Sequence, residues 1–491
     1  MKLYQKVVLA GLAIIVIFAG ATQASACTTL VIGNHATKDG STIIARNEDN
    51  ATNWAKHFVV HNQTSQGPTH YLSKGNGFTI TLSPKQQRYT ATPDWTSKHG
   101  TYGEDGINES NVAMSATEST NSNKRATQAD PFIKKGISED AMLDVTLPFI
   151  HSARQGVQRL GKMISKFGAA ESDGIVFSDK NEIWYMEIGA GHQWAAIQIP
   201  ANYYAIIPNQ LSIGKLVLNN SKKCLISKGL ITFIKRHHLS GYKMREANFA
   251  RAFGTNNKQD ATDNTPRIWD GQRLLTPSRK QNIQSRHLPL LMKPDKKVTI
   301  NKVSDVLSSH FSGTKYDSKG RWVGKYRPIN MPMNDESHIL QIRKTVPKTI
   351  AGIQWLAMAS PDTSVYVPFY TNINATPQSY QIGTDHYDPN SAFWTYKLTS
   401  TLVQPYPTSF TTQYIKPIQE AVESHMQRAL NQSDQVAEQL ASTTALQNYL
   451  TASDQQKANF SQNKFKQLNA KLITQSTSEI FKELHIHINK G

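Results

Sequence analysis

A single cysteine, Cys27, stands at the junction between an N-terminal signal-like segment and the first β-rich run of the chain. Residues 1–26 contain two lysines, the apolar run VVLAGLAIIVIFAGA and then the small residues Ala24-Ser25-Ala26. These are the charged region, hydrophobic region and cleavage site of a secretory signal. We therefore expect export and cleavage after Ala26, which makes Cys27 the first residue of the mature protein.

Two other fates of this segment stay open. The apolar run is shorter than the ~20 residues that a membrane-spanning helix needs, although an uncleaved anchor remains an alternative. Cleavage before a cysteine also produces bacterial lipoproteins, but these usually carry Leu three positions before the cysteine, where this chain has Ala24. The pattern therefore favours the ordinary signal peptidase. We expect contact with a membrane only through the signal, before it is cut.

Charge and cysteine content limit the class of protein further. The 491 residues are 38% hydrophobic, enough for a substantial core, and carry a formal net charge of +18. Loss of Lys2 and Lys6 with the signal leaves +16, which favours an anionic neighbourhood such as a bacterial cell wall. Basic residues are scattered and no nucleic-acid motif is found, so we expect no nucleic-acid partner. With Cys27 and Cys224 alone, the chain is no disulfide scaffold.

The pattern after Cys27 predicts an antiparallel hairpin. CTTLVIG and TIIAR are β-rich runs separated by the turn-prone NHATKDGS. Pairing of Asn34 near Asp39 makes partner numbers sum to about 73, which places Arg46 opposite Cys27. Further on, residues 138–167 have helical spacing broken at Pro148, and residues 174–211 read as a four-strand antiparallel meander.

Strands and helices come in blocks instead of strict alternation, which predicts an α+β layered fold with largely antiparallel sheets. Residues 411–491 are polar with helical spacing, so we expect helices that pack on the domain or trail from it. The expected organisation is a signal over 1–26, a catalytic domain over 27–410 and a helical C-terminal segment over 411–491.

The chemistry of the chain centres on Cys27. A residue made N-terminal by cleavage has its α-amine beside its thiol, and that amine, with a pKa of about 7.7–8.0, can take the thiol proton at neutral pH. Arg46 and Asp49 follow on the returning strand, and an arginine there can lower the thiol pKa. Asn108 and Asn209 follow β-rich runs and are candidate oxyanion donors. Taken singly, these residues also fit an ordinary ion pair and two turn residues.

The run CTTLVIGNHATKDGSTIIARNEDN resembles the start of the dipeptidase A family of lactic acid bacteria. That family of cysteine N-terminal-nucleophile hydrolases is similar to the penicillin V acylases and bile salt hydrolases, and Arg46-Asn47-Glu48-Asp49 matches their Arg-Asn-x-Asp motif. The resemblance covers most of the mature chain, through the segments GINESNVAMSATES, SDGIVFSDKNEIWYMEIGAGHQWAA, IPNQL, ANFARAFG and VYVPFY.

The resemblance implies a four-layer αββα N-terminal-nucleophile hydrolase fold. It implies Cys27 as nucleophile with its α-amine as general base, Arg46 and Asp49 as support for both, and Asn108 and Asn209 at the oxyanion site. The bile salt hydrolases have an Arg-Phe-x-Arg stretch with a further active-site arginine. Here NFAR begins with Asn248, so Arg251 is left without a role.

Other candidate residues have competing interpretations. Glu171, Asp173 and His192 flank predicted strand ends, and each fits either a site for a substrate terminus or a turn or core position. The pairs of histidines at 237–238 and in the HIH triplet at 485–487 lack further ligands at metal spacing, so we expect them at the solvated surface. No metal or cofactor is expected.

The leading hypothesis is a secreted dipeptidase that cleaves short peptides through a thioester on Cys27. Retention of the secreted protein at the bacterial cell wall stays open. One alternative is an amidase or acylase of the same fold that acts on non-peptide amides. Another, from a different class, is a cell-wall-bound interaction protein without enzymatic activity, suggested by the positive charge and the polar C-terminal segment.

Overall fold

The computed structural model describes residues 27–51, 53–66, 70–116, 120–217, 220–240, 242–243, 246–286, 288–319 and 324–483. The predicted export signal and the HIH triplet lie outside these residues. Among the helices within these ranges, none combines the length and the apolar character that a membrane crossing requires.

The described structure begins with the predicted hairpin, formed by β1 (Thr28–Ile32) and β2 (Thr42–Asp49). Its register differs from the predicted one by two residues, because Thr29 and not Cys27 lies opposite Arg46. The turn is shifted by one residue, so that Ile32 pairs with Ile43 and partner numbers sum to 75. A shift by two leaves every side chain on its predicted face, so Cys27 and Arg46 remain on the same side of the sheet.

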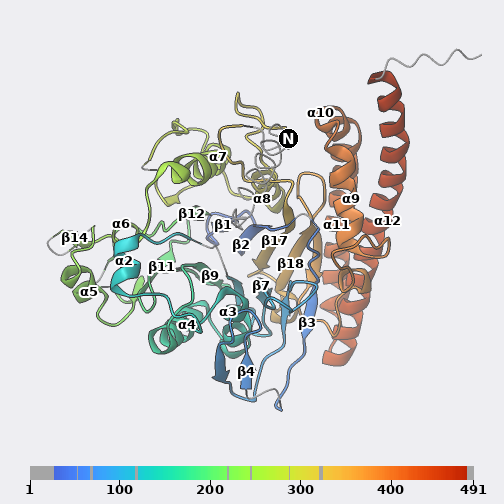
Figure 1. Cartoon of the computed structure of the whole chain (residues 1–491). Coiled ribbons are helices and arrows are strands. Elements are labelled where there is room, and N and C mark those ends of the chain that lie inside the picture. The colour runs from blue at the N-terminus through green and yellow to red at the C-terminus, as the bar shows by residue number, and fades with distance from the viewer. Residues whose placement is uncertain are drawn as a thin grey trace, which may run out of the picture.

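Two antiparallel sheets form the centre of the described structure (Figure 1). The first contains, in spatial order, β16 (Leu291–Met292), β12 (Tyr204–Pro208), β1, β2, β17 (Asn334–Ile342), β18 (Gly352–Met358) and β19 (Val367–Tyr370). The second contains β13 (Cys224–Ile226), β11 (Trp194–Ile199), β10 (Ile183–Ile188), β9 (Gly174–Ser178), β8 (Ala113–Ala116) and β7 (Asp105–Ile107). Short strand pairs flank them: β3 (Val59–His61) with β6 (Tyr89–Ala91), β4 (His70–Leu72) with β5 (Thr79–Thr81), and β14 (Tyr242–Lys243) with β15 (Glu246–Ala247).

Helices cover the outer faces of both sheets (Figure 1). On the second sheet lie α3 (Glu139–Thr146), the short helix η1 (Leu147–Phe149) and α4 (Ala153–Phe167); on the first lie α7 (Thr265–Leu275), α8 (Ile300–Leu307), α9 (Ala392–Val403), α11 (Lys416–Ala437) and α12 (Thr443–Glu483). Smaller helices are α2 (Lys124–Ala129), α5 (Leu230–Arg236), α6 (Phe249–Phe253) and α10 (Pro407–Phe410). The predicted α+β class is confirmed.

Strand alternation explains the layers. Val31 of β1 and Ile44 of β2 join Val176 of β9 in one apolar cluster between the sheets. Their neighbours Leu30 and Ile43 point the other way, into a cluster with the helices outside the first sheet. Because successive residues of a strand face opposite sides, Arg46 of β2 shares the inner face with Ile44.

The predicted meander is only partly correct. β9, β10 and β11 are neighbours in the second sheet. After β11 the chain turns at residues 200–203 and enters the first sheet, where β12 pairs with β1. This crossing places the end of β12 beside the start of β1, with Pro208 opposite Thr28. The predicted break at Pro148 is found, since η1 separates α3 from α4.

The C-terminal segment is helical, as predicted, and it packs on the rest of the protein as far as Leu472 of α12. Leu430 of α11 and Leu450 of α12 belong to the same apolar cluster as strands of the first sheet. The apolar face is thin in the sequence because much of the contact is polar. Asn469 of α12, for example, bonds Thr399 at 2.6 Å and Thr395 at 2.8 Å, both on α9.

Candidate active site

Cys27 directly precedes β1 of the first sheet and is in contact with Arg46 of β2. Its side chain is buried, and its Sγ atom lies 2.9 Å from Nη2 of Arg46. The Nη1 atom of the same guanidinium donates to Oε2 of Glu104 at 2.7 Å, and both side chains are buried. Arg46 therefore links the thiol on one sheet to a carboxylate that directly precedes β7 on the other. The predicted proximity of Cys27 and Arg46 is present, and Glu104 was not predicted from the sequence.

Two opposing effects act on the Cys27 thiol. Burial raises the pKa of the thiol well above its usual range, while the positive charge of Arg46 lowers it. The negative charges of Asp49 and Glu48 add to the increase. The thiolate is the nucleophilic form of cysteine. Formation of a thiolate at Cys27 would therefore need the charge of Arg46 together with a base that removes the thiol proton.

Asp49 ends β2 close enough to act electrostatically on Cys27, but its ion-pair partner is a residue that the sequence did not indicate. Its carboxylate accepts hydrogen bonds from Nη2 of Arg327 and Nδ2 of Asn334. Burial raises the pKa of Asp49, and the charges of Arg327 and Arg267 oppose that shift. The carboxylate is thus fixed in place by two donors at the same end of β2 as Arg46.

Asn209 lies beside Cys27 because β12 pairs with β1. Pro208 is opposite Thr28, so the next residue of β12 continues alongside Cys27. The Oδ1 atom of Asn209 accepts a hydrogen bond from Nη2 of Arg267 at 2.9 Å. This contact settles the orientation of the amide, with the oxygen toward the guanidinium and the Nδ2 donor on the other side.

Arg267, in the first turn of α7, is a site residue that no sequence motif indicated. Its Nη1 donates to the backbone oxygen of Cys27 and, at 2.8 Å, to Oγ1 of Thr28. Its Nη2 donates to Asn209 and, at 2.7 Å, to Oδ1 of Asn264. The side chain is buried. Arg251, the arginine considered from the sequence, is exposed on α6 and does not take this place.

Asn108 lies at the opposite end of the sheets from Cys27. Its Nδ2 donates to the backbone oxygens of Leu147 and Ile150, each at 2.8 Å, and its Oδ1 accepts from the backbone of Ser110 and Val112, each at 3.0 Å. These bonds fasten the turn after β7 to η1. The structure does not bring Asn108 to Cys27, so the predicted oxyanion role is corrected to a structural one.

Replacement of Asn108 with alanine is expected to lower stability far more than activity. The change removes the donors to two backbone carbonyls and should cost about 2–4 kcal/mol in the free energy of unfolding. Urea denaturation and kcat at a temperature where the variant is folded measure the two effects. Asn209→Ala is the matched comparison, and we expect it to lower activity far more than stability. A loss of kcat above tenfold in folded Asn108→Ala protein would contradict this assignment.

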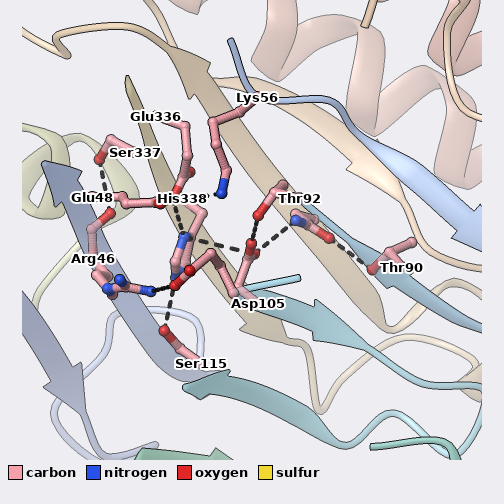
Figure 2. A network of polar contacts seen from close by, with 12 residues as sticks. Arg46, Glu48, Lys56, Thr90, Thr92, Asp105, Ser115, Glu336, Ser337 and His338 are labelled. Carbon is pink, nitrogen blue, oxygen red and sulfur yellow. Dashed lines mark hydrogen bonds and ion pairs between the residues drawn. The ribbon is translucent and has the colours of Figure 1, made fainter. Parts of the chain in front are cut away.

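Behind Arg46, a buried polar network lies between the two sheets (Figure 2). His338 of β17 hydrogen-bonds Oε1 of Glu336 through Nδ1 at 2.9 Å and Oγ of Ser115 through Nε2 at 3.1 Å. Oδ2 of Asp105 is 3.7 Å from Nδ1 of the same ring. Burial lowers the pKa of His338 to about 4, raises that of Glu336 to about 8 and raises that of Asp105 to about 6. At neutral pH the network therefore holds a neutral histidine and a protonated Glu336.

Glu336→Gln is expected to stabilise the protein at alkaline pH and to leave it unchanged near pH 5. The pKa of Glu336 is about 8 in the folded protein against an ordinary 4.5, so its contribution to stability is present at low pH and is lost as pH rises through 8. Glutamine mimics the protonated acid and keeps a donor for His338. We expect Tm to exceed that of the parent by about 2–4 °C at pH 8.5. A lower Tm at both pH values would show that Glu336 is ionised instead.

Two groups of side chains within the described residues have the spacing of metal ligands. One is Asp105, Glu336 and His338, whose hydrogen bonds within the network already use both histidine nitrogens. The other is Glu139, Glu171 and Asp173. His192, the remaining candidate from the sequence, is bound instead to Asp130, with Nδ1 2.9 Å from Oδ1.

Comparison with known proteins identifies the family of the chain. The profile of peptidase family C69 matches residues 26–420, a span that begins immediately before Cys27 and includes Arg46, Asp49, Asn209 and Arg267. The chain belongs to peptidase family C69. This C69 chain is 38% identical over 464 residues to a probable dipeptidase of Latilactobacillus sakei, covering 93% of this chain and 96% of that protein.

Further relatives have the same kind of name. Dipeptidase A of Lactobacillus helveticus is 37% identical over 77% of this chain and 81% of its own length. A dipeptidase of Bifidobacterium longum is 37% identical over 77% of each chain. The resemblance to the dipeptidase A family that the sequence motifs indicated is therefore confirmed.

Proposed function

We propose that this C69 protein is a dipeptidase with the N-terminal-nucleophile hydrolase fold, in which Cys27 is the nucleophile. The observation that carries the proposal is the contact of the Cys27 thiol with Arg46, 2.9 Å away, in a buried site at the start of the family match. The names of the relatives supply the substrate class. The two sheets with helices on both outer faces have the layers that this fold requires.

The proposed reaction proceeds through an acyl-enzyme. The α-amine of mature Cys27 takes the thiol proton, and Sγ forms a bond to the carbonyl carbon of the substrate. Asn209 stabilises the oxyanion through its Nδ2 donor. The C–N bond then breaks, and the proton passes from the α-ammonium to the leaving amine. Water, deprotonated by the same amine, hydrolyses the thioester and restores the thiol.

This mechanism makes proteolytic maturation a condition of activity. In the unprocessed chain the nitrogen of Cys27 belongs to a peptide bond with Ala26 and cannot act as a base. Removal of residues 1–26 during export creates nucleophile and base in one step. We propose export on the signal-like sequence, with retention at an anionic cell wall through the positive charge of the mature chain. Release of the protein from cells by raised salt tests the retention.

A substrate panel tests the proposed activity. The secreted protein is sequenced from its N-terminus and then assayed against dipeptides, penicillin V and a conjugated bile salt at equal concentrations. We expect Cys27 as the first residue and a kcat/KM at least tenfold higher for dipeptides than for the other amides. Higher activity on a non-peptide amide would indicate an acylase. A processed protein that hydrolyses nothing but binds anionic wall polymer would be an interaction protein.

A further inference from the structure

Three carboxyl groups, from Glu139, Glu171 and Asp173, meet close to the Cys27 site. One ligand oxygen from each lies within 4.8 Å of the others. Asp173 is fully buried, and among the described residues neither of its carboxylate oxygens has a hydrogen-bond partner. Glu139 and Glu171 are half-buried, and Oε1 of Glu171 accepts from the backbone N–H of Glu139 at 2.8 Å. The cluster therefore combines two half-buried carboxyl groups with a fully buried one whose oxygens have no hydrogen-bond partner among the described residues.

Strand register places this cluster at the same end of the sheets as Cys27. Oγ1 of Thr42 in β2 donates to the backbone oxygen of Asp179 at 2.8 Å, which aligns the start of β2 with the end of β9. The start of β9, directly after Asp173, therefore lies toward Arg46. Glu104, bonded to Arg46, precedes β7 at this same end of the second sheet.

The cluster has the electrostatic character of a site for a cation. Burial and the negative charges of Glu171, Glu139 and Glu104 raise the pKa of Asp173 well above its ordinary value, and Arg46 opposes that shift. The charge of Glu139 also acts on the Cys27 thiol, which places the two within electrostatic reach. A positive ligand between the carboxylates would satisfy Asp173 and cancel the repulsion among its neighbours.

We propose that Glu139, Glu171 and Asp173 bind the free α-ammonium group of the substrate and so direct Cys27 to the first peptide bond. This inference rests on the proposed dipeptidase function. In a dipeptide the ammonium nitrogen is two bonds from the scissile carbonyl carbon, so the two groups must be bound close together. An ammonium has three donors, which matches three carboxylates. Ca²⁺ takes 6–8 oxygen ligands, and Mg²⁺ needs an octahedral set.

The test compares a dipeptide with its N-acetylated form in the processed protein. We expect the parent to prefer the free dipeptide by at least 10³-fold in kcat/KM. Glu171→Gln and Asp173→Asn should reduce that preference at least 30-fold, through KM for the free dipeptide, without lowering the rate on the acetylated one. Glu246→Gln, at an exposed carboxylate, is the matched control. Because burial raises the pKa of Asp173 and so favours its neutral form, the neutral side chain of Asp173→Asn should leave Tm unchanged.

Two results would overturn the inference. One is an unchanged preference in both variants. The other is loss of activity on chelation with recovery in Ca²⁺ or Mg²⁺, which would make the cluster a metal site. Calorimetric binding of both ligands to processed Cys27→Ala protein separates this inference from the proposed function. If the free dipeptide binds, the acetylated form does not and Glu171→Gln removes the difference, the ammonium site stands even where the parent hydrolyses neither.

Discussion

Replacement of Cys27 with alanine is expected to abolish dipeptide hydrolysis, with a loss of at least ~10⁴-fold in kcat. Cys27 brings a thiol into contact with Arg46, whereas the second thiol of the chain, on Cys224, lies in β13 of the other sheet. The thiol is small and buried, so alanine leaves only a small cavity and the fold should persist. The assay measures release of free amino acid by the processed variant, with N-terminal processing verified by mass.

The second cysteine supplies a matched control. Cys224 of β13 is buried in the apolar cluster between the sheets, and burial raises the pKa of its thiol. Cys224→Ala should therefore keep its activity within a few fold. Iodoacetamide should inactivate the parent and the Cys224→Ala variant at the same rate. Retained activity in processed Cys27→Ala protein would exclude the thioester mechanism.

The part of the site that could be predicted from sequence is the part built within one hairpin. Cys27, Arg46 and Asp49 are close in the sequence, and strand alternation with an approximate turn is enough to bring the first two to one face. A register error of two residues did not matter, because it preserves which face each side chain occupies. The position of Asn209 could be predicted for a similar reason, because this residue follows a strong β-rich run.

The rest of the site depends on contacts that no local pattern contains. Arg267 reaches the backbone of Cys27 from a helix 240 residues further along the chain, and its segment has no motif that sets it apart from other amphipathic helices. Glu104 and Asp173 reach the site because two sheets stack in one particular alignment. Asn108 shows the converse. It follows a strand, as an oxyanion donor would, but it lies at the end of the sheet opposite to Cys27.

Arg267→Lys is expected to lower kcat/KM by about 10²-fold while keeping the positive charge. The planar guanidinium of Arg267 bonds Cys27 and Thr28 through one nitrogen and Asn209 and Asn264 through the other. A lysine ammonium is a single point charge, so it cannot hydrogen-bond Cys27 and Asn209 at the same time. The loss should fall on kcat more than on KM, because the residue positions the nucleophile and the oxyanion donor. Arg273→Lys, on the same helix, controls for the substitution itself.

A double-mutant cycle decides whether Arg267 acts through Asn209. If the arginine serves to orient that amide, Asn209→Ala removes most of what Arg267 contributes, and the double variant should be little worse than Asn209→Ala alone. Effects that multiply would instead mean that the two residues act independently, with Arg267 working through the backbone of Cys27. Equal losses in Arg267→Lys and Arg273→Lys would contradict a specific role. Because the cycle compares rates among folded variants, a purely structural contribution of Arg267 would lower Tm in the two variants that carry Arg267→Lys and leave the coupling near zero.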